Sequence, residues 1–382
     1  MEAIINNRVL RWARERARLD TETAARSITS RPEKFIAWEE GADFPSLSQA
    51  RKIADKLRIP FGYLFLSDPP DEDLPIPDLR TRDDLAPRQI SVDLIEQLSL
   101  TLAKQRWYQE HRIGAGADVH TYVGKYTPDN DISEIAADIR STHNLADLQF
   151  AAQNWTGFLT EFVRAVEANG TLVMRSGVVG NNSRRPLEVN EFQGFAIADP
   201  IAPLIFLNSK DFVAARIFTL AHELAHVWVG ESGISLVDQS EANWGIDIEQ
   251  FCNAIAAEAL VPLSEFRRAW GEAPGVDSDV SRLARRYRVS TIVVLRRALE
   301  ADIIDRNSFF ELLEIERGRQ TRRQSGSGGS QINNIVARNG RIFSEALISA
   351  TYEGRASFDD ATRLLGVKVN TLKTLALEFG IR

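Results

Sequence analysis

The chain has 382 residues, a single cysteine and a formal net charge of −7. Its length predicts more than one domain, because ordinary domains hold roughly 100–200 residues. Its hydrophobic fraction of 44% and charged fraction of 26% are typical of globular proteins and exclude global disorder and collagen-like structure. One cysteine excludes an internal disulfide framework and a cysteine-based zinc cluster, so a bound metal must rely on histidine and carboxylate ligands.

The apolar runs of the chain are short. None approaches the ~18 uninterrupted apolar residues that a membrane-spanning helix needs. Residues 1–18 carry arginines but have neither the apolar core nor the cleavage site of a signal peptide. We therefore expect a cytoplasmic protein without a membrane partner.

Residues 8–66 form the first predicted unit, a compact group of helices. Apolar residues at helical spacing indicate a first helix starting near residue 9 and a fourth around residues 50–57. Between them we expect a second helix from Thr21, as its N-cap, to Ile28. A third helix begins near Pro32, a residue suited to a first helical turn, and ends before a glycine.

This unit resembles an Xre/Cro-type helix-turn-helix domain. The resemblance rests on Trp38-Glu39-Glu40-Gly41, followed by Pro45-Ser46-Leu47 and the helix that ends at Leu57. It implies that the third helix enters the major groove of DNA. The residues on or near the exposed face of that helix are Arg31, Glu33, Lys34 and Ala37.

The charge of this unit differs from that of the whole chain. Residues 8–60 contain 12 basic and 8 acidic side chains, a net charge of +4. Local basicity favours contacts with DNA phosphates. The third helix, however, has no Asn or Gln with which to read bases. A docking domain for a protein partner therefore stays open beside binding of operator DNA.

Residues 67–90 are rich in proline and aspartate and predict a linker or an extended strap that could cover a site. Helical patterns follow over about residues 91–110, 131–141 and 155–169. These helices precede the part of the chain in which the chemistry-bearing residues gather.

Short apolar runs bounded by Gly, Pro and Asn predict three strands of one small sheet. They cover residues 170–179, 195–198 and 204–207. Helical patterns then extend over residues 211–230 and about 246–261. The central region therefore combines helices with a small sheet.

The most informative string is His222-Glu223-Leu224-Ala225-His226, within the predicted helix over residues 211–230. Histidines at positions i and i+4 lie one above the other on a helix face, so both imidazoles can bind one zinc ion. Glu223 lies beside that face, where it can take a proton from a metal-bound water. Because the chain has only five histidines, two of them in this spacing indicate a metal site.

A catalytic zinc ion needs a third protein ligand, and carboxylates downstream are its natural source. The helix over about residues 246–261 offers Asp247, Glu249 and Glu258. Glu249 lies on the same face as Asn253, one turn further on, so a carboxylate ligand and a supporting amide can pair there. This spacing favours Glu249, with Glu258 as the competitor, while Glu241 lies in a loop-like stretch.

The string TLAHELAH, followed by EQFCNAIAAEALVP, resembles the ImmA/IrrE family of metallopeptidases over about residues 150–300. The resemblance implies a zincin-like domain that cleaves a repressor or regulator protein. In that case His222, His226 and Glu249 hold Zn²⁺, Asn253 supports these ligands, and Glu223 is the catalytic general base. The downstream residues that match the family pattern are Glu249, Asn253, Ala256, Ala257, Glu258, Leu260 and Pro262.

The remaining residues predict further helices. Residues 277–317 are rich in arginine and resemble the tail of the family; we interpret their charges as a solvated face, with a partner surface as the alternative. Tyr287 is one candidate for stabilising an oxyanion. The string SGSGGS at 325–330 predicts a flexible linker. Residues 331–382 resemble a short helix-turn-helix and are expected to bind a partner.

The predicted fold is mainly α with a small β-sheet (α+β). It comprises an N-terminal all-α helix-turn-helix, a central zincin-like metallopeptidase domain and C-terminal helical modules. The expected segments are 1–66 (helix-turn-helix), 67–90 (linker), 91–274 (helices plus metallopeptidase domain), 275–323 (Arg-rich extension), 324–330 (Gly/Ser linker) and 331–382 (C-terminal module).

Together these features predict a DNA-binding transcription regulator fused to a zinc-dependent endopeptidase, which cleaves a regulatory protein with metal-activated water. The alternative is an antitoxin or autorepressor that binds a cognate toxin, a PIN-like nuclease, and its own operator, with little or no peptidase activity. The expected partners are a protein substrate or cognate toxin, operator DNA and a second copy of the chain in a homodimer.

Overall fold

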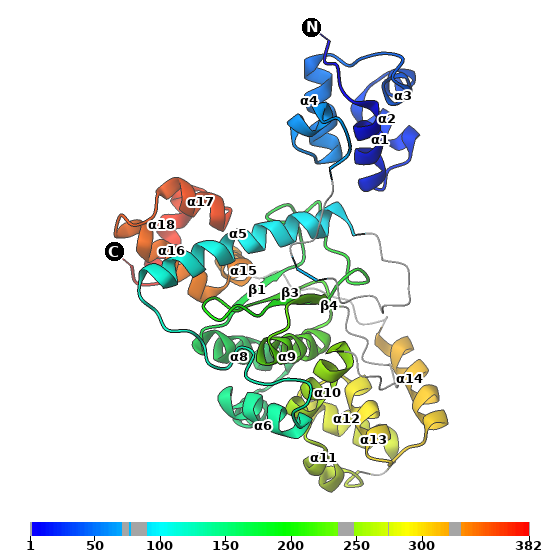
Figure 1. Cartoon of the computed structure of the whole chain (residues 1–382). Coiled ribbons are helices and arrows are strands. Elements are labelled where there is room, and N and C mark those ends of the chain that lie inside the picture. The colour runs from blue at the N-terminus through cyan, green and yellow to red at the C-terminus, as the bar shows by residue number, and fades with distance from the viewer. Residues whose placement is uncertain are drawn as a thin grey trace. The chain divides into compact units, whose positions relative to one another are not determined.

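The computed structural model describes residues 2–70, 76–77, 90–235, 248–273, 275–320 and 330–381. Within these ranges it contains eighteen α-helices and one four-stranded sheet (Figure 1), which confirms the mainly α fold class with a small sheet. No helix among them has the length and apolar character needed to cross a membrane. Most of the two predicted linkers, together with Glu241 and Asp247, lies outside the described residues.

The chain divides into two compact units. The first comprises Met1–Pro75 and Pro87–Leu98, and the second comprises Ile76–Ala86 and Ser99–Arg382. The second unit therefore contains both the predicted metallopeptidase region and the C-terminal helices.

The N-terminal unit is a group of short helices around Phe35 and Trp38, both fully or almost fully buried. Its elements are α1 (Asn7–Arg16), α2 (Thr21–Ile28), α3 (Pro32–Glu40), α4 (Leu47–Leu57) and the 3₁₀ helix η1 (Phe61–Phe65). The predicted N-cap of the second helix was wrong by one residue. Asp20 caps α2, because its backbone is extended and its carboxylate accepts a hydrogen bond from the amide of Thr23.

The sheet of the second unit has the strand order β1-β3-β2-β4. Its strands are β1 (Leu172–Ser176), β2 (Gly194–Ile197), β3 (Leu204–Asn208) and β4 (Gly233–Ser235). β1 is parallel to β3, while β2 is antiparallel to both β3 and β4. The carboxyl ends of β1, β3 and β4 and the amino end of β2 therefore meet at one end of the sheet.

Helices cover both faces of this sheet (Figure 1): α8 and α9 lie on one face, and the part of α5 from residue 99 onward lies on the other. Residues 217–229 of α9 are buried throughout, because the helix is enclosed by the sheet, α8 and α10. The helices up to residue 320 are α5 (Val92–Gly114), α6 (Ile132–Thr142), α7 (Leu145–Ala151), α8 (Trp155–Ala168), α9 (Val213–Val229), α10 (Ile248–Leu260), α11 (Leu263–Ala269), α12 (Val276–Tyr287), α13 (Thr291–Glu300) and α14 (Arg306–Gln320).

The C-terminal helices pack against the β1 side of the sheet, with α15 beside β1 (Figure 1). They are α15 (Gln331–Asn339), α16 (Arg341–Tyr352), α17 (Phe358–Leu365) and α18 (Val369–Glu378). Two polar contacts, one buried and one partly buried, join the two sides of this seam. Lys104 Nζ donates to Asn339 Oδ1 at 2.7 Å, and the amide of Arg341 donates to Glu167 Oε1 at 2.7 Å.

Both ionisable groups of the seam titrate abnormally. Burial, together with the positive charge of Arg338, lowers the pKa of Lys104 to about 7. Burial raises the pKa of Glu167 to about 7, although its hydrogen bond from Arg341 opposes the shift. The seam is therefore a buried polar contact whose charge state changes near neutral pH.

Candidate metal centre

Helices α9 and α10 bring together three predicted metal ligands. His222 and His226 lie one turn apart on α9, and Glu249 lies in the first turn of α10. The Nε2 atoms of the two histidines are 3.0 Å apart. Glu249 Oε2 lies 3.3 Å from His222 Nε2, and Glu249 Oε1 lies 3.0 Å from His226 Nε2. In the described part of the chain, this is the one cluster of potential ligands close enough to hold a metal ion.

These distances fit a tetrahedral zinc site. Ligand atoms at normal zinc distances and tetrahedral angles lie about 3.3 Å apart. Burial raises the pKa of Glu249, but the charges of His222 and His226 and their hydrogen bonds outweigh it and lower the pKa to about 2. Burial lowers the pKa of His222. The lowered pKa of Glu249 favours an ionised carboxylate, and the lowered pKa of His222 favours loss of the imidazole proton, as metal ligation requires.

Glu223 lies next to His222 on α9 and is fully buried. Neither of its carboxylate oxygens has a hydrogen-bond partner among the described residues. Burial raises its pKa well above the ordinary value, and the negative charge of Glu249 adds to this effect, while Ser235 opposes it. Such a carboxyl group retains a proton readily, as a group that accepts a proton and passes it on must do.

Strand β2 approaches Glu223 closely at Gly194. A Cβ atom on Gly194 would lie 2.6 Å from Glu223 Oε1 and 2.8 Å from Thr219 Cγ2. A side chain at this position would therefore displace Glu223. Gly194 could not be recognised from the sequence, because a glycine at the edge of a strand is an ordinary boundary signal.

Residues 167–299 match the family model of the IrrE N-terminal-like domain. The matched range, called the IrrE-like domain below, includes all four strands, both histidines, Glu223 and Glu249. The match supports the ImmA/IrrE family and a metallopeptidase-like domain in this part of the chain. Residues 339–378 match the model of a domain of unknown function (DUF8813). A comparison with curated proteins finds no significant match.

Asn253 of the IrrE-like domain lies one turn after Glu249 and beside His222. Burial keeps the pKa of the His222 imidazole below its ordinary value, and the side chain of Asn253 opposes this shift. Asn253 Oδ1 and His222 Nδ1 are both buried and make no hydrogen bond to the described residues. The structure thus places Asn253 where it can orient His222, a role that side chains behind metal ligands commonly have.

Glu258, the competing candidate for the third ligand, points away from the histidines. Its carboxylate accepts the amide of Leu263 at the start of α11 and forms an ion pair with Arg297 of α13. Glu258 therefore joins three helices of the domain and is not part of the cluster. Asp247 and Glu241 lie outside the described residues.

Tyr287, the candidate for stabilising an oxyanion, also lies away from the cluster. Gln149 Nε2 donates to the backbone oxygens of both Leu260 and Tyr287, at 2.8 Å each. Leu260 ends α10, whereas Glu249 lies in its first turn. Tyr287 thus lies at the opposite end of α10 from the candidate metal ligands.

The outer edge of β4 borders the cluster. Ser235 Oγ at the end of β4 lies 3.5 Å from Glu249 Oε1. The amide of Ile234 points away from β2 and donates to the backbone oxygen of Pro77 at 3.0 Å, and Ile76 is buried. Two described residues of the predicted strap therefore lie against the edge strand next to the candidate metal centre.

The predicted DNA-contacting residues lie at α3 of the N-terminal unit. Arg31 directly precedes the helix and is exposed, as is Glu33, whereas Lys34 and Ala37 are partly exposed. A short turn of residues 29–31 separates α2 from α3. These four residues are therefore accessible to a partner, whether nucleic acid or protein.

Proposed function

We propose that the IrrE-like domain is a zinc-dependent endopeptidase. The observation that carries this proposal is the convergence of His222, His226 and Glu249, with the buried carboxyl group of Glu223 beside them. Three protein ligands leave a fourth coordination position for water, the arrangement of catalytic zinc sites. When bound, zinc supplies Lewis-acid polarisation of a carbonyl group and activation of water.

Glu223 moves the proton in this scheme. Its carboxylate accepts a proton from the attacking water and delivers it to the leaving amine nitrogen. Neither oxygen makes a hydrogen bond of ordinary length and angle to the described residues, so both can take part in this transfer. Gly194 contributes by leaving space for the carboxyl group.

We propose that the substrate is a regulatory protein that presents an extended segment to β4. Extended peptides bind to exposed sheet edges through backbone hydrogen bonds. The amide of Ile234 faces outward at this edge. The next residue, Ser235, has its hydroxyl oxygen 3.5 Å from Glu249 Oε1. The backbone oxygen of Pro77 accepts a hydrogen bond from that amide, so a substrate segment that pairs there must displace Pro77.

The test compares the zinc-loaded full chain with its Glu223→Gln variant on a proteome-derived peptide library, with cleavage read by mass spectrometry. We expect both to hold about one zinc ion per chain and the variant to cleave at least about 100-fold more slowly. Glu231→Gln, at an exposed position after α9, is the matched control. Undiminished cleavage by Glu223→Gln, or an equal loss in Glu231→Gln, rejects the proposed role.

We also propose that the N-terminal unit binds operator DNA through α3. The +4 charge of residues 8–60 and the accessibility of Arg31 and Lys34 support this. Arg31→Ala and Lys34→Ala should weaken binding to the promoter of the protein's own gene, whereas Lys56→Ala, exposed on α4, serves as control. No binding of the wild-type chain at low salt favours docking of a protein partner.

The alternative function is that of an antitoxin or autorepressor that binds a PIN-like nuclease toxin and its own operator. It requires neither zinc nor Glu223. The Glu223→Gln variant separates the two functions, since an antitoxin retains full toxin neutralisation when this carboxyl group is removed. Light scattering of the same preparations tests the proposed homodimer.

A further inference from the structure

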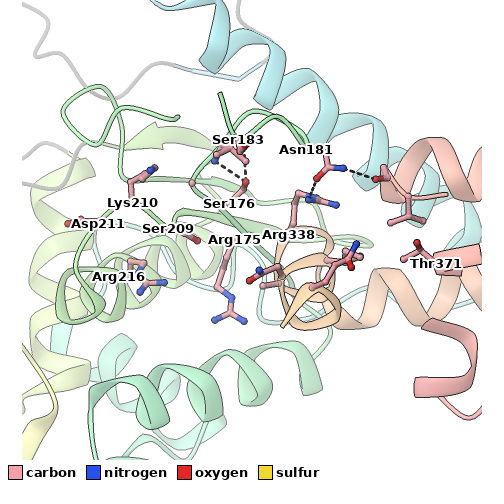
Figure 2. A pocket seen from close by; sticks show the side chains of 18 of the residues that line it. Arg175, Ser176, Asn181, Ser183, Ser209, Lys210, Asp211, Arg216, Arg338 and Thr371 are labelled. Carbon is pink, nitrogen blue, oxygen red and sulfur yellow. Dashed lines mark hydrogen bonds between the residues drawn. The ribbon is translucent and has the colours of Figure 1, made fainter. Parts of the chain in front are cut away.

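A large cavity lies in the second unit, between the sheet and the C-terminal helices. Its volume is about 1770 Å³. Segments that are distant in the sequence line it: the end of β1 with the following loop, the loop before α9 with its first turn, helices α15, α17 and α18 (Figure 2), and Thr156 at the start of α8. None of the candidate metal ligands lines this cavity.

The cavity is strongly basic. Among the described residues that line it, Asp211 is acidic and six are basic: Arg175, Lys210, Arg216, Arg338, Arg363 and Lys368. Arg363 pairs with Asp360, and Arg338 donates to Asn181. The other four basic side chains have no ion-pair partner in the described part of the chain. The cavity therefore holds an excess of positive charge.

Arg175 and Arg216 are the clearest indication that the cavity accepts an anion. Burial lowers the pKa of both guanidinium groups, and the charge of Arg175 lowers that of Arg216 further. The Nε atom of each is buried and has no hydrogen-bond partner among the described residues. The negative charge of Glu167 opposes the pKa shift of Arg175, and that of Asp211 opposes the shift of Arg216. A bound anion would supply further negative charge and acceptors for the two unpartnered Nε donors.

Backbone groups add to the positive potential. The N-caps of α9 and α18, Phe212 and Lys368, make no side-chain capping hydrogen bond, so first-turn amides of both helices can receive an anionic oxygen. The cavity also adjoins the carboxyl ends of the parallel strands β1 and β3, marked by Ser176 and Ser209 in Figure 2. Ligands of sheets with parallel strands commonly bind at such ends.

We propose that this cavity binds a small phosphorylated ligand of nucleotide size through its phosphate groups. Guanidinium groups bind phosphate oxygens in pairs, and Lys210 and Lys368 supply further charge from opposite walls. The volume exceeds the ~300–1,000 Å³ of ordinary small-molecule sites, which leaves room for several phosphates and a base. Asp211 Oδ2, buried and without a partner among the described residues, can accept an N–H of that base.

The partial burial of Arg175 and Arg216 and the scarcity of aromatic side chains in the described lining favour a small ligand over a nucleic-acid strand. Proteins track a strand with exposed charged grooves and stacked aromatic side chains. Here Arg175 and Arg216 are partly buried, and the lining includes a single aromatic residue, Phe212, among the described residues. The described lining therefore lacks the row of aromatic side chains on which the bases of a strand would stack.

The experiment is calorimetric titration of the full chain with inorganic tripolyphosphate, ATP and GTP at low salt. We expect at least one to bind and Lys210→Ala and Arg216→Gln each to weaken it by about tenfold or more. Lys368→Ala tests the wall formed by the C-terminal helices and should weaken binding as well. Lys373→Ala is the matched control, because Lys373 is exposed on α18 but does not line the cavity.

Three results would overturn the proposal. The first is no saturable binding of any probe up to about 1 mM, the weak end of specific affinity. The second is binding that Arg216→Gln leaves unchanged or that Lys373→Ala weakens equally. The third is a single-stranded RNA of about 12 nucleotides that binds more tightly than all three probes and responds to the same variants, which assigns the cavity to nucleic acid. Unchanged thermal midpoints show that each variant is folded, and Lys210→Ala changes only an exposed side chain.

Discussion

The candidate metal centre and the basic cavity lie at the same end of the sheet and share helix α9, yet they are built in different ways. α9 contributes Arg216 to the cavity and, six residues later, His222 to the metal centre. The candidate metal centre takes His222, Glu223 and His226 from adjacent turns of α9. Glu249 comes from α10, the next described helix. The cavity is assembled from segments that span residues 156–371.

The charged groups that line the two regions also differ. The candidate metal centre places the buried Glu223 and the partly buried Glu249 beside two buried imidazoles, an arrangement suited to a cation. The cavity collects arginine and lysine side chains and uncapped helix ends, an arrangement suited to an anion. One end of a small sheet therefore carries two candidate sites of opposite charge preference, and changes at one should leave the other intact.

The largest effect should follow removal of a metal ligand. His222→Ala should reduce the zinc content from about one per chain to near zero, since two remaining ligands hold zinc weakly. Tripolyphosphate binding should remain as in the wild type. Elemental analysis and calorimetry on one preparation measure both, with His111→Ala as control, because His111 is outside the cluster. Retained zinc would exclude His222 as a ligand. Loss of tripolyphosphate binding would show that the two sites are not independent.

A second prediction addresses Glu223 through its neighbour. In Gly194→Ala the added methyl group lies 2.6 Å from Glu223 Oε1, so the carboxyl group must shift. Because a displacement of about 1 Å can reduce a rate about 100-fold, cleavage should fall by one to two orders of magnitude, with zinc content unchanged. Gly157→Ala, whose methyl group meets its nearest atom at 3.6 Å, is the control. Wild-type cleavage by Gly194→Ala would argue against the position assigned to Glu223.

The clustering of His222, His226 and Glu249 was largely predictable because the information for it is local. The spacing of His222 and His226 fixes their common helix face, and the relation of Glu249 to Asn253 selected the carboxylate that the structure brings to the histidines. Strand β4 was missed because three residues carry no alternation of apolar and polar positions. Its role beside the metal centre depends on pairing with β2, which no local pattern encodes.

The cavity was not predictable from the sequence, because its residues meet only through tertiary packing. Arg175 is an ordinary residue of a short strand, and Lys368 reads as a surface charge of a separate C-terminal module. Their proximity depends on the seam between α5, β1 and α15, which includes the contact of Lys104 with Asn339 across 235 positions of the sequence. Contacts of this range leave no periodic signal in a single sequence.

A third prediction tests the cavity wall. Asn339→Ala removes the acceptor of Lys104 Nζ and the donor to the backbone oxygens of Ile335 and Leu365. Leaving a buried charged group without its partner costs about 2–3 kcal/mol, so the thermal midpoint should fall and tripolyphosphate should bind more weakly, with normal zinc content. Asn333→Ala, exposed on the same helix, is the control. An unchanged midpoint would show that this seam contributes little to stability.

The smallest effect concerns the pH dependence of the seam. The pKa of Glu167 rises from 4.5 to about 7, chiefly through burial, so the folded protein keeps a proton that the unfolded chain releases between these values. Its contribution to stability is therefore full below pH 4.5 and is lost as the pH rises through 7. Glu167→Gln is neutral at every pH and retains an acceptor for the amide of Arg341.

The variant and the wild type should therefore have similar thermal midpoints near pH 4.5, where Glu167 is protonated in the folded protein. Above pH 7 the variant should be more stable by about 1–3 kcal/mol, because only the wild type must bury a carboxylate or keep it protonated at a cost. Glu161→Gln, exposed on the same helix α8, should follow the wild type at all pH values. A pH-independent difference between Glu167→Gln and the wild type would mean that the hydrogen bond to Arg341, and not the charge of Glu167, governs the seam.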